Sequence, residues 1–179
     1  MCLLGFAGFL RFSELVNIKR SDLEFFQKYM TIIIPRSKTD VHGSGSELVI
    51  SRTATDLCPV SMVERYLNAA HILPNSTDYI FRQLSYCKLS NCYRLRNSGP
   101  LSYTRAREIL LEKLEIIGLD SKRFGLHSLR SGGATAAANA GVIDRMFKKH
   151  GRWKSDKAKD GYVHENIDER TSVTKKLGL

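Results

Sequence analysis

The sequence has 179 residues, 42% of them hydrophobic, which is typical of a globular domain with a buried core and excludes a disordered chain. Its 28 lysines and arginines exceed its 18 aspartates and glutamates, and the net charge of +10 favours a polyanionic partner such as nucleic acid. No apolar run reaches the ~18 residues of a membrane span, and neither the four cysteines nor the five histidines have the spacing of a disulfide framework or a metal site. We therefore expect no metal, no cofactor, no membrane partner and no small-molecule substrate.

The first predicted helix runs from about residue 3 to residue 16, where apolar residues recur at helical spacing. It places Arg11 three residues before Glu14, so that the two side chains are neighbours at the rim of the buried surface. An isolated Arg-x-x-Glu pair is typical of a surface ion pair of little energetic weight. The pattern by itself therefore identifies no site.

Two strands are predicted next, over residues 31–34 and 47–51. The first is a β-branched run that ends at Pro35, and the second alternates between apolar and polar residues. Glycines at 43 and 45 mark a turn between the strands, which predicts a small antiparallel ribbon. Lys38 lies in the "RSKTD" connection beside this turn, where an ordinary solvated lysine is also expected.

Helical periodicity returns from Pro59, and again from Ser102 or Thr104 to Ile117. Residues 74–101 lie between these helices and are rich in Asn, Gly and Pro. They are predicted to be loop around a short extended segment, with a basic and aromatic patch in "YCKLSNCYRLRN". No internal repeat or linker divides the chain, so a single domain is expected.

The stretch "HSLRSGGATAAANAG" predicts a helix over residues 127–141, whose Ala and Gly residues allow close packing against its neighbours. A short helix, "IDRMFKKH", follows and ends at Gly151. His127 and Arg130 project from one face at the start of the first of these helices, an arrangement suited to binding phosphate. A capping detail or a solvated face remains an alternative reading of the pair.

Taken in order, "GFLRFSEL", "RSKTD" after a strand, "HSLR", "GRW" and the tyrosine of "DGYVHE" resemble the motifs of the tyrosine recombinase family. These are the phage-integrase-like DNA strand-exchange enzymes, and the resemblance extends from residue 3 to about residue 168. It implies an α+β, mainly helical fold with a small antiparallel β-ribbon. The whole chain, 1–179, is expected to be one catalytic domain without the N-terminal DNA-clamping domain, and with a tail at residues 163–179 suited to assembly.

The resemblance implies six catalytic residues, carried over motif by motif: Arg11, Lys38, His127, Arg130, Trp153 and Tyr162. Many family members have Gly-His where this chain has Gly-Arg-Trp. Trp153 takes the position of the family's histidine or tryptophan because it lies nine residues before Tyr162. A core anchor remains the alternative reading of Trp153, and a surface aromatic that of Tyr162.

Strand transfer to the Tyr162 phenol through a 3′-phosphotyrosine link, with neither metal nor ATP, is the implied reaction. Arg11 and Arg130 suit the charge that develops on the phosphate, because guanidinium stays protonated and presents a planar fork to two oxygens. Glu14 is expected to orient Arg11.

The other catalytic roles are implied by the resemblance. His127 helps as an acid or base, Lys38 protonates the departing 5′ oxygen, and Trp153 donates its indole N–H to a phosphate oxygen. Five further cations are expected to contact DNA: Arg36, Lys122, Arg123, Arg152 and Lys154.

The expected partner is double-stranded DNA, on which the resemblance implies a homotetramer. "GRWKSD" is similar to eukaryotic mobile-element recombinases, so a nuclear location is expected for a eukaryotic source and a cytoplasmic one otherwise. Two alternatives stay open: a truncated or domesticated DNA-binding module without strand exchange, and a type IB topoisomerase.

Overall fold

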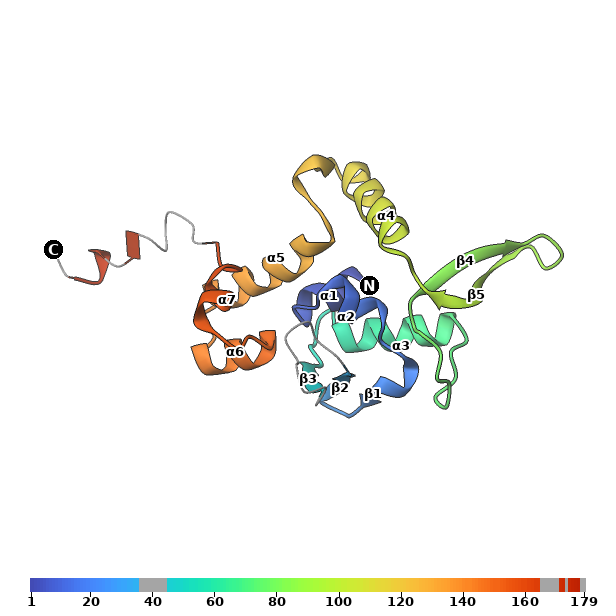
Figure 1. Ribbon diagram of the computed structural model, residues 1–179, viewed down its shortest axis with the longest axis horizontal. Coiled ribbons are helices and arrows are strands. Elements are labelled where there is room, and N and C mark those ends of the chain that lie inside the picture. The colour runs from blue at the N-terminus through green and yellow to red at the C-terminus, as the bar shows by residue number, and fades with distance from the viewer. Residues whose placement is uncertain (36–44, 165–170, 173, 178–179) are drawn as a thin grey trace.

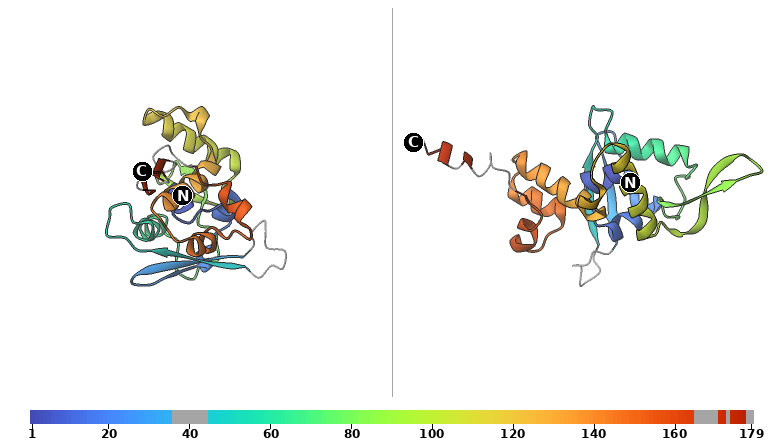
Figure 2. Two further views of the ribbon diagram at one scale, coloured as in Figure 1. Left: turned by 90° about the vertical axis from the view of Figure 1, so that its left-hand side faces the viewer. Right: turned by 90° about the horizontal axis from the view of Figure 1, so that it is seen from above.

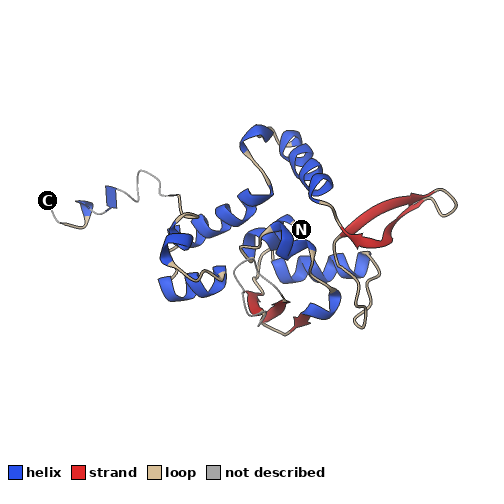
Figure 3. Cartoon of the chain, viewed as in Figure 1, coloured by secondary structure: helices blue, strands red, loops and turns tan. Residues whose placement is uncertain are grey.

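The computed structural model describes residues 1–35, 45–164, 171–172 and 174–177. The first part of the chain forms α1 (Cys2–Ala7), α2 (Phe12–Val16), the 3₁₀ turn η1 (Arg20–Asp22), β1 (Leu23–Phe25), β2 (Tyr29–Ile34), β3 (Ser46–Ser51) and α3 (Pro59–Ala69). The second part forms β4 (Arg82–Cys87), β5 (Cys92–Pro100), α4 (Tyr103–Ile116), the 3₁₀ turn η2 (Ser121–Arg123), α5 (Leu126–Asn139), α6 (Asp144–Gly151) and α7 (Asp156–Asp160). The fold is mainly helical, as expected, and it contains two small antiparallel sheets where one ribbon was expected (Figures 1 and 3). In the described part of the chain, no helix combines the length and the apolar character that crossing a membrane requires.

The predicted ribbon is a three-stranded antiparallel sheet in the order β1-β2-β3. Ile32 of β2 lies opposite Leu23 of β1 and Leu48 of β3, and all three side chains are buried. The β-branched run favours an extended backbone, and the sheet buries one face against α1–α3 in the larger hydrophobic core. The two predicted strands are thus confirmed, and the short strand β1 is additional.

The single helix expected over residues 3–16 is wrong: α1 and α2 are separated by an elbow. Phe9 has a φ of +46°, and Arg11 is extended, with φ −68° and ψ 153°. The elbow buries Phe9 and Leu10 on opposite sides of the bend, in different hydrophobic clusters. Periodicity did not reveal the break because the apolar residues continue through it. Arg11 consequently occupies the N-cap position of α2 rather than a helical turn.

The prediction of loop over residues 74–101 is wrong for most of this segment, which contains the antiparallel hairpin β4–β5; the short extended segment expected within it, "YIFRQL", overlaps the start of β4. Strand β4 has no buried side chain, and the segment is rich in turn-forming residues. Neither hydrophobic alternation nor composition therefore predicted the hairpin. The hairpin projects from the body at the opposite end from α5, α6 and α7 (Figures 1 and 2).

Helix α5 packs closely against α1, as its small residues predicted. A Cβ atom built on Gly133 would lie 2.1 Å from the carbonyl oxygen of Phe6, so only glycine permits this approach. A second hydrophobic cluster lies beside this contact and contains Phe9, Ala134, Phe147 and Trp153. This cluster contains Trp153, and Tyr162 packs against it, so two of the predicted catalytic residues are part of this core or in contact with it.

Candidate active site

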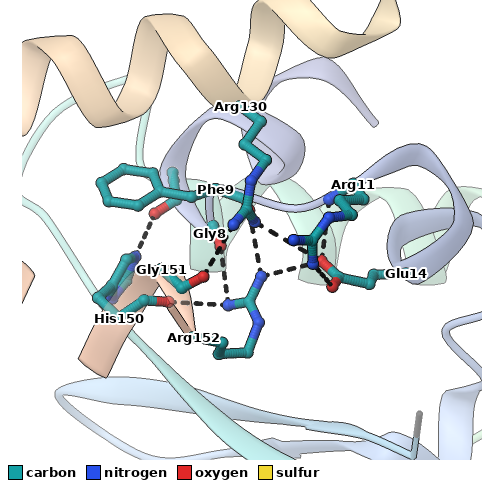
Figure 4. Close-up of polar contacts among 9 residues, drawn as sticks. Gly8, Phe9, Arg11, Glu14, Arg130, His150, Gly151 and Arg152 are labelled. Atoms are coloured by element: carbon teal, nitrogen blue, oxygen red, sulfur yellow. Dashed lines mark hydrogen bonds and ion pairs between the residues drawn. The ribbon is translucent and has the colours of Figure 1, made fainter. Parts of the chain in front are cut away.

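Glu14 is a buried carboxylate that joins two arginines from distant parts of the chain (Figure 4). Its Oε1 accepts a hydrogen bond of 2.8 Å from Nη1 of Arg11, and its Oε2 accepts one of 2.9 Å from the Arg11 backbone N–H. Oε2 also accepts a hydrogen bond of 3.0 Å from Nη2 of Arg152. The expected orientation of Arg11 by Glu14 is therefore present, through a cap rather than through helical spacing.

A third guanidinium, that of Arg130, lies 3.9 Å from Oε2 of Glu14. Burial by itself raises the pKa of Glu14, but the positive charges of Arg152 and Arg11, with the hydrogen bonds from Arg11, outweigh it and lower that pKa. Glu14 is therefore ionised at neutral pH and holds a cluster of cations together.

Arg130 is fully buried at the start of α5. Its guanidinium donates to the carbonyl oxygen of Phe9, and Nη2 donates to that of Gly151 at 2.9 Å. Burial, followed by the charge of Arg11, lowers the pKa of Arg130 to about 10, so the group remains protonated at neutral pH. The cation is thus built into the protein and held in one orientation.

Two aromatic rings lie against the Arg130 guanidinium. Its Cζ is 4.8 Å from the ring centroid of Tyr162 and 5.0 Å from that of Trp153. The Tyr162 ring is also 5.2 Å from the His127 ring and 5.5 Å from the Trp153 ring. His127, Arg130, Trp153 and Tyr162 therefore lie together in the structure, although up to 35 positions separate them in the sequence.

His127 lies on the exposed side of this group. Partial burial, and then the charges of Arg130 and Arg11, lower the pKa of His127 below its ordinary value of 6.5. The imidazole is consequently neutral at pH 7, the state in which it can accept a proton.

Trp153 is a core anchor that also carries an unused donor. Its ring packs 4.9 Å from that of Phe147, and a Cβ on Gly151 would lie 2.0 Å from the indole, so Gly151 makes room for it. Among the residues that the structure describes, none accepts a hydrogen bond from the buried indole Nε1. The core-anchor reading of Trp153 is therefore confirmed, and donation from its indole N–H to a phosphate stays a prediction.

Thr135 is a residue that the sequence analysis missed. Its hydroxyl donates to the carbonyl oxygen of Tyr162 at 3.1 Å and accepts from the backbone N–H of His164 at 3.2 Å. It follows Arg130 by five residues on α5, and its hydroxyl in a row of Ala and Gly is the only sequence signal that marks it.

The structure corrects the expected role of Arg152 as a DNA contact. Its side chain is only 6% exposed, pairs with Glu14, and donates to the carbonyl oxygens of Gly8, Phe9 and His150 at 3.2, 3.1 and 2.8 Å. Arg152 ends α6 in the left-handed conformation, with φ +57°, which turns the side chain inward. It is a structural partner of Glu14.

The remaining expected DNA contacts stay predictions. Lys122, Arg123 and Lys154 are exposed, as a phosphate contact requires. Arg36 and the proposed catalytic Lys38 lie outside the described residues.

Comparisons with known proteins identify the family and the fold. The model of the phage integrase family matches residues 1–169. An integrase/recombinase xerD homolog from Selenomonas ruminantium is 32% identical over 163 residues, which are 90% of this chain and 45% of that protein. The chain thus spans less than half the length of this curated relative.

Solved structures share the fold at low sequence identity. The XerH site-specific recombinase, bound to a palindromic difH substrate in a post-cleavage complex, has a TM-score of 0.70 and 17% identity, with 99% of this chain and 44% of that chain covered. The XerA recombinase has a TM-score of 0.67 and 19% identity, with 98% and 54% covered. The Tn1549 transposon integrase, in complex with circular intermediate DNA, has a TM-score of 0.61 and 17% identity, with 97% and 55% covered. With the family match over residues 1–169, these findings show that the chain belongs to the phage integrase family, the tyrosine recombinases.

Proposed function

We propose that this chain is the catalytic domain of a DNA recombinase that cleaves and rejoins strands through Tyr162. The observation that carries the proposal is the contact of the Tyr162 ring with the Arg130 guanidinium, beside His127 and Trp153. A phenol is a weak nucleophile near its ordinary pKa of ~10, and a neighbouring cation and a base are the groups that activate it.

The reaction balances without an external cofactor. The Tyr162 oxygen attacks the phosphorus, the phenolic proton passes to a base, and the bond to the 5′ oxygen breaks as that oxygen takes up a proton. The product is a 3′-phosphotyrosine link, which a 5′ hydroxyl then reverses with the same or another strand. Because each bond broken is replaced by a similar ester, no ATP is consumed.

The site's cations match the charge of this transition state. A five-coordinate phosphorane places additional negative charge on its non-bridging oxygens, and fixed donors stabilise that state more than the ground state. Arg11 is 19% exposed and can meet a phosphate, and the free Nε1 of Trp153 can supply a further donor. His127, neutral at pH 7, suits the base.

The structure corresponds to a closed site. Both terminal nitrogens of Arg130 donate to backbone carbonyls, and Tyr162 lies on its guanidinium. We propose that the Tyr162 ring moves aside when a phosphate enters, while its phenol stays beside Arg130 and within reach of that phosphate. The Tyr162 segment follows the short helix α7, whose residues are mostly exposed, and Tyr162 itself is only partly buried against the second hydrophobic cluster.

Double-stranded DNA is the proposed substrate, in a homotetramer as the resemblance implies. The net charge of +10 supports a polyanionic partner. The related XerH and Tn1549 proteins were solved with DNA. A DNA-binding module without strand exchange is the second candidate, and it is favoured by the burial of Arg130, whose two terminal nitrogens already donate to backbone carbonyls.

A covalent trapping experiment tests the proposal. A nicked suicide duplex, which loses a short strand after cleavage, is incubated with the chain and resolved on a denaturing gel. We expect an adduct with the wild type and with Tyr103→Phe, a matched change at an exposed tyrosine, and none with Tyr162→Phe. Absence of any wild-type adduct at low salt, with DNA binding retained, would support the binding module instead.

A further inference from the structure

The β4–β5 hairpin is an arm that the proposed catalytic mechanism does not use. It extends from the body beside α3, away from the helices that carry the catalytic residues (Figures 1 and 2). Its first strand has six residues, Arg82–Cys87, and at ~3.3 Å per residue the arm reaches about 20 Å. The strand β4 contains no buried residue, so packing within the protein does not explain the arm, and we ask which partner it contacts.

The two faces of the hairpin differ in chemistry. Tyr86 lies opposite Tyr93 on one face, with the rings 5.2 Å apart. Ser85 lies opposite Arg94, so these two share the other face because side chains alternate along a strand. Arg96 is two residues from Arg94 and donates to Gln83 at 3.2 Å, which places it there as well. We call the surface formed by Gln83, Ser85, Arg94 and Arg96 the basic face.

Charge on the arm is of one sign. Every charged residue between Asp78 and Glu108 is Lys or Arg. At the base of the arm, Arg82 is engaged within the protein, with Nη1 3.4 Å from the Asp78 carboxylate and its side chain 10% exposed. Within the described ranges, by contrast, no carboxylate forms an ion pair with Lys88, Arg94 or Arg96, and all three residues are exposed.

We propose that the basic face, together with Lys88 at the tip, is a second DNA-binding surface that contacts phosphates away from the scissile one. The proposal rests on the proposed function of the chain as a DNA recombinase. A two-stranded ribbon fits the major groove of B-DNA, and exposed cations without a carboxylate partner gain most by displacing the counterions of a duplex. Arg94 and Arg96, with Cα atoms ~6.6 Å apart along one strand, can reach successive phosphates.

The opposite face provides the competing interpretation. Tyr86 and Tyr93 are 50% and 71% exposed, so this face could instead meet a second copy of the chain. Charge decides between the two occupants. The exposed cations of the arm attract the closely spaced phosphates of a duplex, whereas another copy of the chain, with a net charge of +10, offers no comparable concentration of negative charge to this arm.

Salt dependence of DNA binding tests the arm directly. In a Tyr162→Phe background, which allows binding to be measured without cleavage, Lys88, Arg94 and Arg96 are changed together to Gln. A control changes Lys28, Lys113 and Lys175 to Gln, which removes the same charge from exposed sites elsewhere. The dissociation constant for a duplex longer than the arm and the body is measured by fluorescence anisotropy over a range of salt.

We expect the slope of log affinity against log salt to become shallower by about 2 to 3 in the arm variant, since each phosphate contact contributes about 0.9. The control is expected to keep the parent slope. Equal slopes for parent and arm variant would overturn the proposal, and so would an equal loss in the control. Thermal melts show that the variants are folded, because none of the changed side chains is buried.

A second variant, Tyr86→Ser with Tyr93→Ser, decides the occupant. Sedimentation of this variant is expected to match that of the parent. If it instead loses self-association while the arm variant keeps the parent's salt slope, the hairpin is a protein contact and the proposal is wrong. Failure of the adduct experiment with the wild type would leave these binding results interpretable, so the two proposals fail separately.

Discussion

The Oε2 atom of Glu14 lies 3.0 Å from Nη2 of Arg152, although 138 residues separate the two in sequence. Through this contact one carboxylate joins the elbow before α2 to the end of α6, and the same carboxylate holds Arg11 at 2.8 Å. The position of Arg11 therefore depends on Arg152, the residue before Trp153 in the sequence.

Removing the charge of Glu14 is expected to destabilise the fold strongly. Glu14→Gln leaves the buried Arg152 and Arg130 without their counter-charge, which costs about 3 kcal/mol or more in such pairs. The matched control is Glu64→Gln, whose ion pair with Arg52 is about one-third exposed and contributes ~1 kcal/mol or less. Urea unfolding measures the free energy of unfolding of both variants. Similar losses of this free energy would show that the buried Glu14 cluster stabilises the fold no more than an exposed ion pair does.

Acid should remove the Glu14 contribution. The pKa of Glu14 is lowered in the folded state from its ordinary value of 4.5, so the unfolded chain takes up the proton first as pH falls. The stabilisation is therefore complete above pH ~5 and is lost as pH falls through the folded pKa. The free-energy difference between the wild type and Glu14→Gln, measured by urea unfolding from about pH 7 to about pH 3, should shrink on acidification. A difference that grows would mean that the pKa is raised.

Arg11→Lys should slow catalysis more than it affects stability. Lysine keeps the charge beside Glu14, and the backbone cap of α2 is unaffected, but the planar fork is lost. We expect adduct formation to slow by ~100-fold, the usual scale for loss of a transition-state donor. Arg105→Lys, at an exposed pair with Glu108, should leave the rate unchanged. An undiminished rate in Arg11→Lys would remove Arg11 from phosphate binding.

Thr135 is expected to act as a positioning residue for Tyr162. Thr135→Val removes the hydroxyl that joins the Tyr162 carbonyl to the His164 N–H, two hydrogen bonds of about 1 kcal/mol each. We expect single-turnover adduct formation to slow by ~10-fold or more with DNA affinity unchanged. Thr135→Ser keeps the hydroxyl and should restore the rate. If serine fails to rescue, packing of the methyl group rather than the hydroxyl determines the effect.

Gly151→Ala should displace the indole of Trp153. The new Cβ would lie 2.0 Å from the ring, so the indole must leave the cluster of Phe9 and Phe147, at a cost of about 1–3 kcal/mol. Because Trp153 is the single tryptophan, its fluorescence reports the change as a red shift. Gly99→Ala, whose Cβ meets nothing within 4 Å, is the control. An unshifted spectrum in Gly151→Ala would show that the backbone, not the indole, adjusts.

The resemblance of short motifs to those of the tyrosine recombinase family supplied the types and order of the candidate catalytic residues. The nine-residue spacing from Trp153 to Tyr162, and the His127 and Arg130 pair on one helical turn, needed no tertiary information. The strands around residues 31–34 and 47–51 and the helices after Pro59 and Ser102 followed from the same short-range periodicity and capping signals.

Only the tertiary structure decided how these groups meet. The carbonyl oxygen of Phe9 lies at the elbow between α1 and α2. It accepts hydrogen bonds from Arg130 and Arg152, which lie 121 and 143 residues away in the sequence. Such contacts are made to backbone carbonyl groups, which every residue carries, so no side-chain pattern predicts them. Two further features were also not predictable from side-chain patterns: the inward turn of Arg152 and the β4–β5 arm. One results from a left-handed backbone at a non-glycine residue, and the other from cross-strand pairing without a buried face.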